Sequence, residues 1–190
     1  MATRHTVQFF DGPESLGRDV AAYFAEGLGC RDRLLLMARR AHVAAVTESL
    51  AERSISVSDL VAAGELTIIE SASALRTIMA NGRPRGETFE RVIGDAIRSA
   101  AARGPVQLRI YAELVDVLVC ENNLRGCEEL EAMWRALLEQ VPMRLHTGYT
   151  SATFATARMG AAMKRICDRH DAVHRNDTDL LANWLLAQHT

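Results

Sequence analysis

The sequence predicts an α/β protein of three layers, in which helices cover both faces of a mainly parallel β-sheet. Three observations support this class. Short apolar segments typical of strands alternate along the chain with longer segments whose apolar residues recur at helical spacing. Residues 34–38 are apolar throughout, which is typical of a central parallel strand buried on both faces. The 190 residues suit one domain of ordinary size, and no segment has the composition of a linker.

Five segments have the pattern of strands. In chain order we expect strands at residues 6–10, 34–38, 66–69, 106–110 and 143–149. The fourth alternates apolar and polar residues with the period of a strand. The others are short and rich in aliphatic or aromatic residues, and helical segments separate them, as in a parallel sheet.

Helices are expected where apolar residues recur every three or four positions. These stretches are residues 16–28, 43–50, 89–100 and 130–141. Pro13 suits the start of the first helix, because its missing N–H would be unpaired there. In the last of these helices, the pattern places Glu131 on the outer, charged face. The tail, residues 153–188, is expected to add one or two helices with a break near 176–177, so that residues 1–190 form one domain.

Composition excludes several classes of protein. The net charge is −2, with 22 basic and 24 acidic residues, so a direct nucleic-acid partner is not expected. No apolar run reaches the ~20 residues that cross a bilayer, and the N-terminus has no signal-peptide core. We therefore expect a cytoplasmic protein without a membrane partner. Its four cysteines are expected to be free thiols: Cys30, Cys120, Cys127 and Cys167.

The first strand-to-helix turn is the natural phosphate site of such a fold, but its residues do not suit a phosphate. A phosphate loop needs glycine N–H groups, a lysine and a Ser/Thr. Here the turn contains Asp11, Pro13 and Glu14, and the only lysine of the chain, Lys164, lies far away. We expect neither nucleotide hydrolysis nor a bound cofactor.

Ligands in open α/β sheets usually bind beyond the carboxyl ends of the strands. The expected strand ends are 10–11, 38–40, 70–71, 111–113 and 149–151. These ends bring acids, bases, hydroxyls and aromatic rings to one edge of the sheet. The candidate ligand-binding residues from these ends are Phe10, Arg39, Tyr111, Glu113 and Tyr149.

Each polar candidate also has a structural interpretation. Glu113 could bind a ligand, or it could interact with the N-terminus of the helix that follows it. Arg39 could hold an anionic ligand, or it could be a solvated charge or form a salt bridge to a partner. His5, at the start of the first strand, is either part of a site or a surface or interface histidine.

The C-terminal segment contains one pattern that would suit a metal. Cys167, His170 and His174 follow each other at spacings of three and four, which would place them on one side of a helix. A thiolate and two imidazoles are suitable ligands for zinc. The alternative is that His170 belongs to a stripe with Met163 and Ile166 that packs on the core.

Four stretches resemble the MEDS family, the methanogen and methylotroph sensory domain of bacterial and archaeal signalling proteins. They are residues 5–10, 26–37, 109–134 and 166–170. Their order and spacing extend the resemblance over roughly residues 5–174. Two positions depart from the family pattern: Ala112 stands where a glycine is usual, and Gly148 where a cysteine is common.

The resemblance implies a fold derived from RecA/KaiC-like ATPases that has lost the phosphate loop. It also implies a noncatalytic sensory role for small hydrocarbon-derived ligands, with a kinase, an anti-sigma protein or another regulator as partner. It places His5 near the site, and it draws Cys167 and His170, from the family's C-terminal motif, into the candidate set. The loss of a cysteine at Gly148 argues against thiol-based sensing on that strand.

Three hypotheses follow from the sequence. The first is a sensory domain that binds a small organic ligand and relays the signal to a partner protein. The second is a ligand-free interaction adaptor, perhaps homodimeric, for a kinase or an anti-sigma system. The third is a metal-dependent sensor or enzyme that uses Cys167, His170 and His174.

Overall fold

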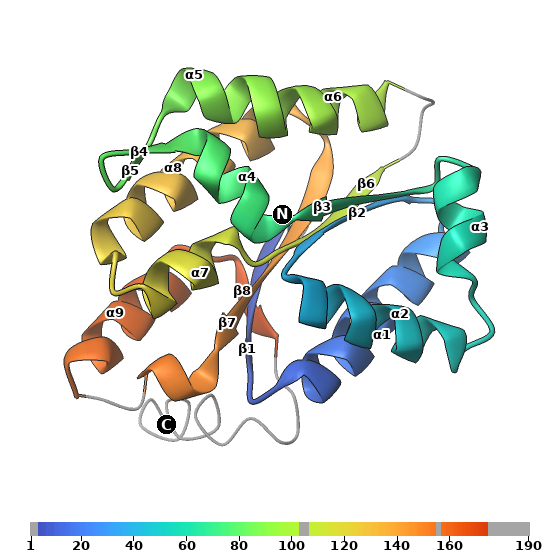
Figure 1. Ribbon diagram of the computed structural model, residues 1–190, viewed down its shortest axis with the longest axis horizontal. Coiled ribbons are helices and arrows are strands. Elements are labelled where there is room, and N and C mark those ends of the chain that lie inside the picture. The colour runs from blue at the N-terminus through green and yellow to red at the C-terminus, as the bar shows by residue number, and fades with distance from the viewer. Residues whose placement is uncertain (1–3, 103–106, 155–156, 175–190) are drawn as a thin grey trace.

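A computed structural model of the chain describes residues 4–102, 107–154 and 157–174. Its centre is a sheet of six parallel strands in the order β3-β2-β6-β7-β1-β8 (Figure 1). The strands are β1 (His5–Phe10), β2 (Arg33–Ala38), β3 (Leu66–Glu70), β6 (Leu108–Ala112), β7 (Met143–Thr150) and β8 (Ala172–His174). Strands β4 (Met79–Ala80) and β5 (Arg83–Pro84) form a separate antiparallel hairpin. The five predicted strands are confirmed, and β8 is an addition to them.

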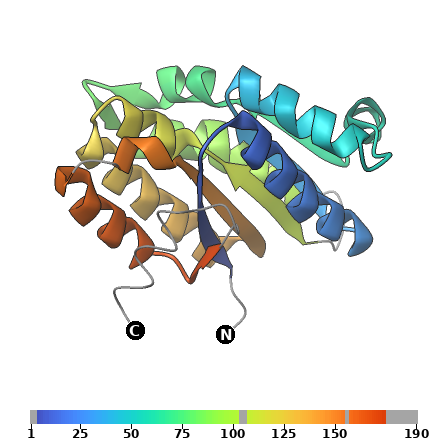
Figure 2. The same ribbon diagram turned by 90° about the horizontal axis from the view of Figure 1, so that it is seen from below.

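Helices cover both faces of the sheet, as predicted. Helices α1 (Pro13–Gly29) and α2 (Arg40–Ala51) lie on one side, and α8 (Leu124–Gln140) and α9 (Ala157–Cys167) on the other (Figure 2). The remaining helical segments are α3 (Val57–Ala62), α4 (Ser71–Ile78), α5 (Gly86–Phe89), a π-helical turn (Glu90–Gly94), α6 (Asp95–Ala101), α7 (Leu114–Cys120) and a 3₁₀ turn (Ser151–Phe154). Among the described residues, no helix is long and apolar enough to cross a membrane.

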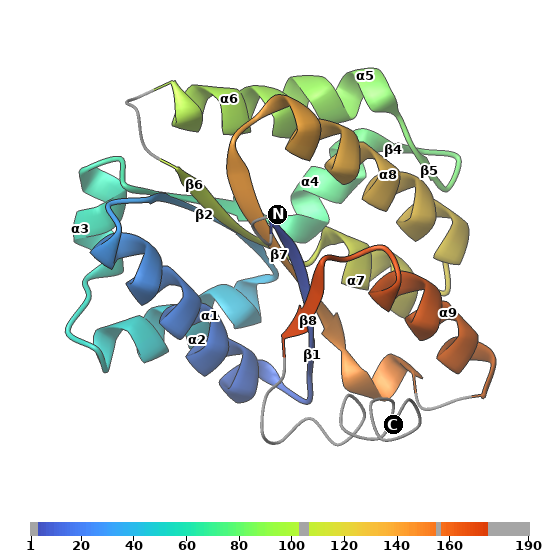
Figure 3. The same ribbon diagram turned by 180° about the vertical axis from the view of Figure 1, so that it is seen from behind.

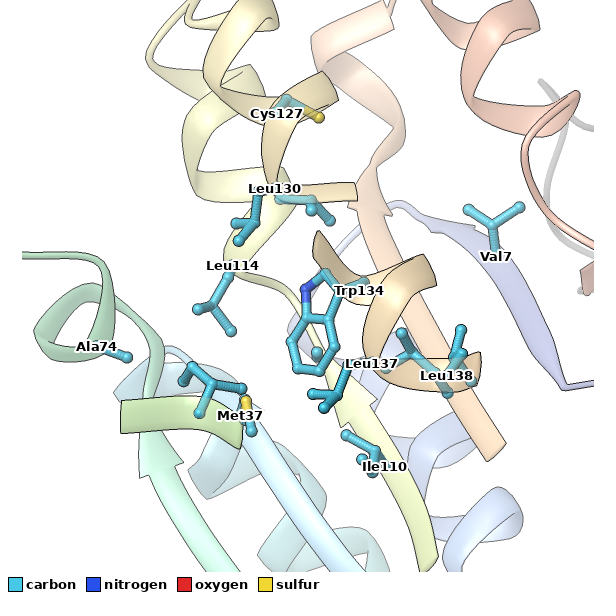
Figure 4. Packing of buried hydrophobic residues seen from close by; sticks show 14 of the residues in the cluster. Val7, Met37, Ala74, Ile110, Leu114, Cys127, Leu130, Trp134, Leu137 and Leu138 are labelled. Atoms are coloured by element: carbon cyan, nitrogen blue, oxygen red, sulfur yellow. The ribbon is translucent and has the colours of Figure 1, made fainter. Parts of the chain in front are cut away.

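The core forms two layers, one on each side of the sheet. Along β2, Leu35 and Met37 point into one layer, whereas Leu34 and Leu36 point into the other. This alternation explains why the strand is apolar throughout. The larger layer surrounds Trp134 of α8, which is fully buried and packs edge-on against Phe89 at 5.4 Å between ring centroids (Figure 4 shows Trp134 among its neighbours).

The C-terminal segment differs from the two helices predicted for residues 153–188. A helix is present as α9, but the chain then turns and adds β8 beside β1 (Figure 3). The physical reason is Asp171. Its carboxylate accepts hydrogen bonds from the backbone N–H groups of Arg4 (2.8 Å) and His5 (2.9 Å), and its own N–H donates to the carbonyl of His5. The predicted break near 176–177 lies outside the described residues.

Candidate functional site

Polar side chains from the ends of four strands meet at the carboxyl edge of the sheet. We call this group the rim cluster, and its members are Arg39, His42, Ser71, Glu113, Asp116 and Thr150. Strand β2 leads into the first two, β3 into Ser71, β6 into the two acids, and β7 ends on Thr150. The cluster therefore lies where ligands of open α/β sheets usually bind.

Glu113 is the centre of the rim cluster and is completely buried. Its carboxylate accepts hydrogen bonds from the backbone N–H of Arg39 and from Nδ1 of His42. The Ser71 hydroxyl approaches it at 3.5 Å. The side chain makes no cap of α7, the helix that Glu113 precedes. Glu113 instead ties the segments that follow β2, β3 and β6 to one another.

Asp116 is the second buried acid of this cluster. Its carboxylate pairs with the Arg39 guanidinium at 2.7 Å, and it accepts hydrogen bonds from the backbone N–H (2.8 Å) and hydroxyl (3.0 Å) of Thr150. Burial works against the charge of Arg39, but Asp116 and Glu113 outweigh it and raise the pKa of Arg39. Both acids are thus held by donors from this chain.

The first turn has a geometry that does not suit a phosphate loop. Only Asp11 and Gly12 separate β1 from α1. The hydroxyl of Ser15 donates to the carbonyl of Gly12 at 3.0 Å and lies 3.4 Å from the Gly12 N–H. Phe10, at the end of β1, is buried and packs edge-on against His42 at 5.3 Å. This turn closes on itself and on the rim cluster.

A second polar group lies inside the layer between the sheet and α8. We call it the histidine cluster, and its members are His5, Cys127, Glu131, Thr147, Tyr149 and His170. Nε2 of His5 lies 3.8 Å from one carboxylate oxygen of Glu131, and Nε2 of His170 lies 3.7 Å from the other. The two imidazole rings are 3.9 Å apart between centroids. Three metal-ligating residues therefore converge from β1, α8 and the turn after α9.

The surroundings of the histidine cluster keep its groups uncharged or poorly reactive. Burial, reinforced by His170, lowers the pKa of His5 to about 2, so its imidazole is neutral at pH 7. Burial raises the pKa of the Cys127 thiol to about 12 and that of Tyr149 well above its usual value. The Tyr149 hydroxyl donates to Glu131 at 2.6 Å.

The hydrogen bonds of this cluster are incomplete. Nε2 of His5 and one carboxylate oxygen of Glu131 are buried, and neither has a hydrogen-bond partner in the described part of the chain. His170, in contrast, is paired on both ring nitrogens, with the Ile166 carbonyl at 2.7 Å and the Thr147 hydroxyl at 2.8 Å. Buried polar atoms in proteins are rarely left unpaired, so two that face each other need a reason.

Comparison with protein families decides the identity. Residues 4–165 match the model of the MEthanogen/methylotroph, DcmR Sensory domain, MEDS. The chain belongs to this family. The comparison with curated proteins found no match.

Two solved structures show that this MEDS domain shares the fold of KaiC-like proteins. An uncharacterized protein of Pyrococcus horikoshii, PH0321, solved with an unknown peptide, has a TM-score of 0.62 at 12% identity over 91% of this chain and 77% of its own. The KaiC-like protein PH0186 of the same archaeon has a TM-score of 0.54 at 13% identity over 93% and 76%. At these identities the similarity concerns the fold alone.

The structure divides the predicted ligand residues of the MEDS domain into three places. Phe10, Arg39 and Glu113 meet in the rim cluster. His5, Tyr149 and His170 meet in the histidine cluster, with Cys167 half-buried at the end of α9 nearby. Tyr111 lies apart, in the core layer toward α1 and α2, where its hydroxyl has no hydrogen-bond partner among the residues described.

Tyr111 accounts for the unusual glycine on β7. A side chain at position 148 would overlap the Tyr111 hydroxyl, because a Cβ there would lie 2.9 Å from the Cζ atom of that ring. Burial raises the pKa of Tyr111 well above its usual value, so the hydroxyl is protonated. Gly148 thus makes room for a tyrosine on the adjacent strand.

Three interpretations of single residues were wrong. His5 is not a surface histidine, because only 5% of it is exposed. Glu131 does not lie on the outer face of α8, because α9 covers that side of the helix and leaves it 4% exposed. Cys167, His170 and His174 do not share a helix face: the helix ends at Cys167, and His174 lies on β8, with its ring against His146 at 5.5 Å.

The sequence analysis also missed three residues that complete the two clusters. His42 and Ser71 lie in the first turns of helices that follow strands, where hydroxyls and histidines are common. Asp116 had a clearer signal, because it is a lone carboxylate inside the apolar helix Leu114–Cys120. A buried acid needs partners, so an acid in an apolar stripe indicates a polar cluster.

Proposed function

We propose that this MEDS domain is a noncatalytic sensor that binds a small organic molecule in a groove between α8 and α9 and relays binding to a signalling protein. Membership of a family of sensory domains supports the sensory role. The location rests on one observation: two cavities between these helices lead to the unpaired polar atoms of His5 and Glu131.

The lining of the groove suits a small molecule with an apolar part and one polar group. The two cavities share Glu128, Glu131 and Arg169. One has apolar walls that include Leu124 and Ile166, which would accommodate a hydrocarbon-derived group. The other reaches His5 and has a volume of about 250 Å³. Pockets with apolar walls and few polar groups are typical small-molecule sites.

The properties of the groove favour binding over catalysis. The Cys127 thiol, with its pKa raised to about 12 by burial, is protonated at neutral pH and is a poor nucleophile. Tyr149 is protonated for the same reason. His5, with its pKa near 2, cannot supply a proton at pH 7. These groups can accept or donate hydrogen bonds to a ligand without reacting with it.

Helix α9 and strand β8 are the proposed moving part. The segment connects to the rest of the domain through Asp171, which binds the backbone of β1, and through Arg135, whose guanidinium donates to the carbonyl of Arg169. A molecule between α8 and α9 would favour the arrangement of α9 that it fits best. A ligand shifts a conformational equilibrium only through such a difference in affinity.

A thermal-shift screen with small alcohols, halocarbons and short carboxylic acids tests the binding step. Ala132, on the exposed surface of α8, lines the groove, whereas Ala136, one turn further along the same helix, is exposed outside it. At least one compound should stabilise the wild-type protein and Ala136→Trp but not Ala132→Trp. Stabilisation of no variant, or of all three equally, would overturn the proposal and favour a ligand-free adaptor.

Hydrogen exchange tests the relay step with the same compound. Amide exchange in α9 and β8 should slow when the ligand binds, while exchange in α1 and α2, on the other face of the sheet, should stay unchanged. Equal protection of all helices would show general stabilisation without a directed change in α9.

A further inference from the structure

We propose that the histidine cluster binds a divalent transition-metal ion of the zinc type, held by Nε2 of His5, the carboxylate of Glu131 and Nε2 of His170. The chemistry of the three donors supports this class of ion. Two imidazoles and one carboxylate are typical of zinc sites that keep a position open for water or another small ligand. This is not the set of Cys167, His170 and His174 that the sequence indicates.

The geometry is close to that of a filled site. The three ligand atoms lie within 4.8 Å of one another, with separations of 3.8 and 3.7 Å from the two histidines to Glu131. Zinc bound tetrahedrally at about 2.0–2.1 Å would set such atoms roughly 3.3 Å apart. Side-chain shifts of less than about 1 Å would therefore close the site, which is within the reach of side-chain rotation alone.

The unpaired atoms give a second, independent reason. Nε2 of His5 and one oxygen of Glu131 are buried and face each other, and no described residue donates to or accepts from either. An ion between them would bind both. The same ion would meet the Nε2 lone pair of His170, because Nδ1 of that ring donates to the Ile166 carbonyl.

The surrounding residues fit the role of outer-shell partners. The bond from Nδ1 of His170 to a carbonyl is the usual way in which a ligating histidine is oriented. The Tyr149 hydroxyl holds the Glu131 carboxylate at 2.6 Å. If His170 turned from Thr147 to the ion, the Thr147 hydroxyl could keep the carbonyl of Thr6, which lies 3.3 Å away.

Charges around the site are balanced. Arg135 and Arg169 line the adjoining cavity and would oppose a cation, whereas Glu128 lines the same cavity and would favour it. Asp171 acts on His5 in the same direction as Glu128. The cavity beside His5 and Glu131 also leaves room for a fourth ligand. If the proposed organic ligand has a lone pair, this open position is where it would meet the ion, and only this last step rests on the proposed function.

Equilibrium dialysis of EDTA-treated protein with Zn²⁺ tests the site. The wild-type protein should bind one ion per chain. His5→Asn, Glu131→Gln and His170→Asn should each weaken binding by at least about 100-fold, because the loss of outer-shell partners alone costs 10- to 100-fold. The matched controls His174→Asn and Glu139→Gln, both exposed in the structure, should bind as the wild type does. No retained zinc, or equal retention by all variants, would overturn the inference.

A second measurement needs no substitution in the core. Zinc-edge X-ray absorption of the loaded wild-type protein should show two imidazoles and oxygen ligands, and a sulfur ligand would overturn the assignment. Ala132→Trp separates this inference from the proposed function, because it should retain the ion while losing the organic ligand. Zinc without any organic ligand would leave the metal site standing alone, and an organic ligand without zinc would leave the sensor standing alone.

Discussion

The rim cluster and the histidine cluster both bury carboxylates against histidines, but they differ in how many of their polar atoms are paired. In the rim cluster, Glu113 and Asp116 receive hydrogen bonds from backbone N–H groups, hydroxyls, an imidazole and a guanidinium. In the histidine cluster, Glu131 receives one hydrogen bond, from Tyr149, and one of its oxygens has no partner within the described ranges.

The difference separates a structural tie from a binding site. The rim cluster occupies the position where nucleotide-binding relatives of this fold would place a ligand, yet its donors and acceptors satisfy each other. The histidine cluster lies away from that edge and is left incomplete. A buried polar atom without a partner costs free energy, so a cluster that retains two of them is better explained by an absent occupant than by stability.

The largest expected effect tests the structural role of the rim cluster. Glu113→Ala should lower the free energy of unfolding by about 3–5 kcal/mol, because it leaves His42 and the Arg39 N–H buried without their acceptor. Urea denaturation followed by circular dichroism measures the change. Glu52→Ala, at an exposed position on the same side of the domain, should change stability by less than about 0.5 kcal/mol. A mild effect of Glu113→Ala would show that the rim cluster is free to exchange its partners for a ligand.

Acid is expected to act on the buried histidines. Burial lowers the pKa of His5 to about 2 and that of His146 to about 3, so both are neutral in the folded protein but take up protons when it unfolds below about pH 6.5. Unfolded chains then bind more protons, and stability falls as the pH drops from 6.5 toward 4. Each histidine should contribute about 1.4 kcal/mol per pH unit in this window.

Urea denaturation of EDTA-treated protein between pH 7 and pH 4 measures this slope. His146 lies between the Thr6 hydroxyl (2.6 Å) and the side-chain oxygen of Gln8 (2.7 Å), which suits the neutral ring. The substitution His146→Gln should therefore reduce the slope by about half. A slope that is unchanged in this variant would place the acid sensitivity elsewhere in the molecule.

An unpaired polar atom alone does not mark a site, and Tyr111 provides the test. Its hydroxyl is buried without a partner in the described residues, but no metal-ligating group converges on it; it fills the space beside Gly148. Gly148→Ala should cost about 1–3 kcal/mol through overpacking. Adding Tyr111→Phe removes the clashing oxygen and should restore most of the loss in a thermal-denaturation cycle. Failure of this rescue would mean that the clash is not with the hydroxyl.

Much of the fold was predictable because its signals are local. Central parallel strands are buried on both faces, so β2 appears in the sequence as an uninterrupted apolar run. The rim position of Glu113 was predictable too, because parallel strands end at one edge. Strand β8 was missed because only three residues form it, and it is held by bonds from Asp171 to the distant backbone of β1.

The histidine cluster could not be assembled from the sequence, because its members are brought together by packing between distant elements. Glu131 follows the spacing of an exposed position, and it is buried because α9, more than 25 residues later, covers that side of α8. Likewise, the partnership of His5 and His170 depends on the turn after α9, whose return to β1 leaves no periodic pattern. Contacts of this kind are set by tertiary structure, which overrides local preference.

The smallest expected effects compare one hydroxyl in each cluster. Tyr149→Phe and Thr150→Val each remove a single donor to a buried carboxylate, at 2.6 Å from Glu131 and 3.0 Å from Asp116. Asp116 keeps the Arg39 guanidinium and the Thr150 N–H, so Thr150→Val should cost about 0.5–1 kcal/mol. Glu131 loses its one hydrogen-bond donor among the described residues, so Tyr149→Phe should cost more, about 1–2 kcal/mol, in metal-free protein. Saturating Zn²⁺ should narrow this gap, since an ion would supply the charge that the carboxylate then lacks. Urea titrations with and without Zn²⁺ measure both values, and an equal cost for the two variants in metal-free protein would remove the distinction between a completed cluster and one that awaits an occupant.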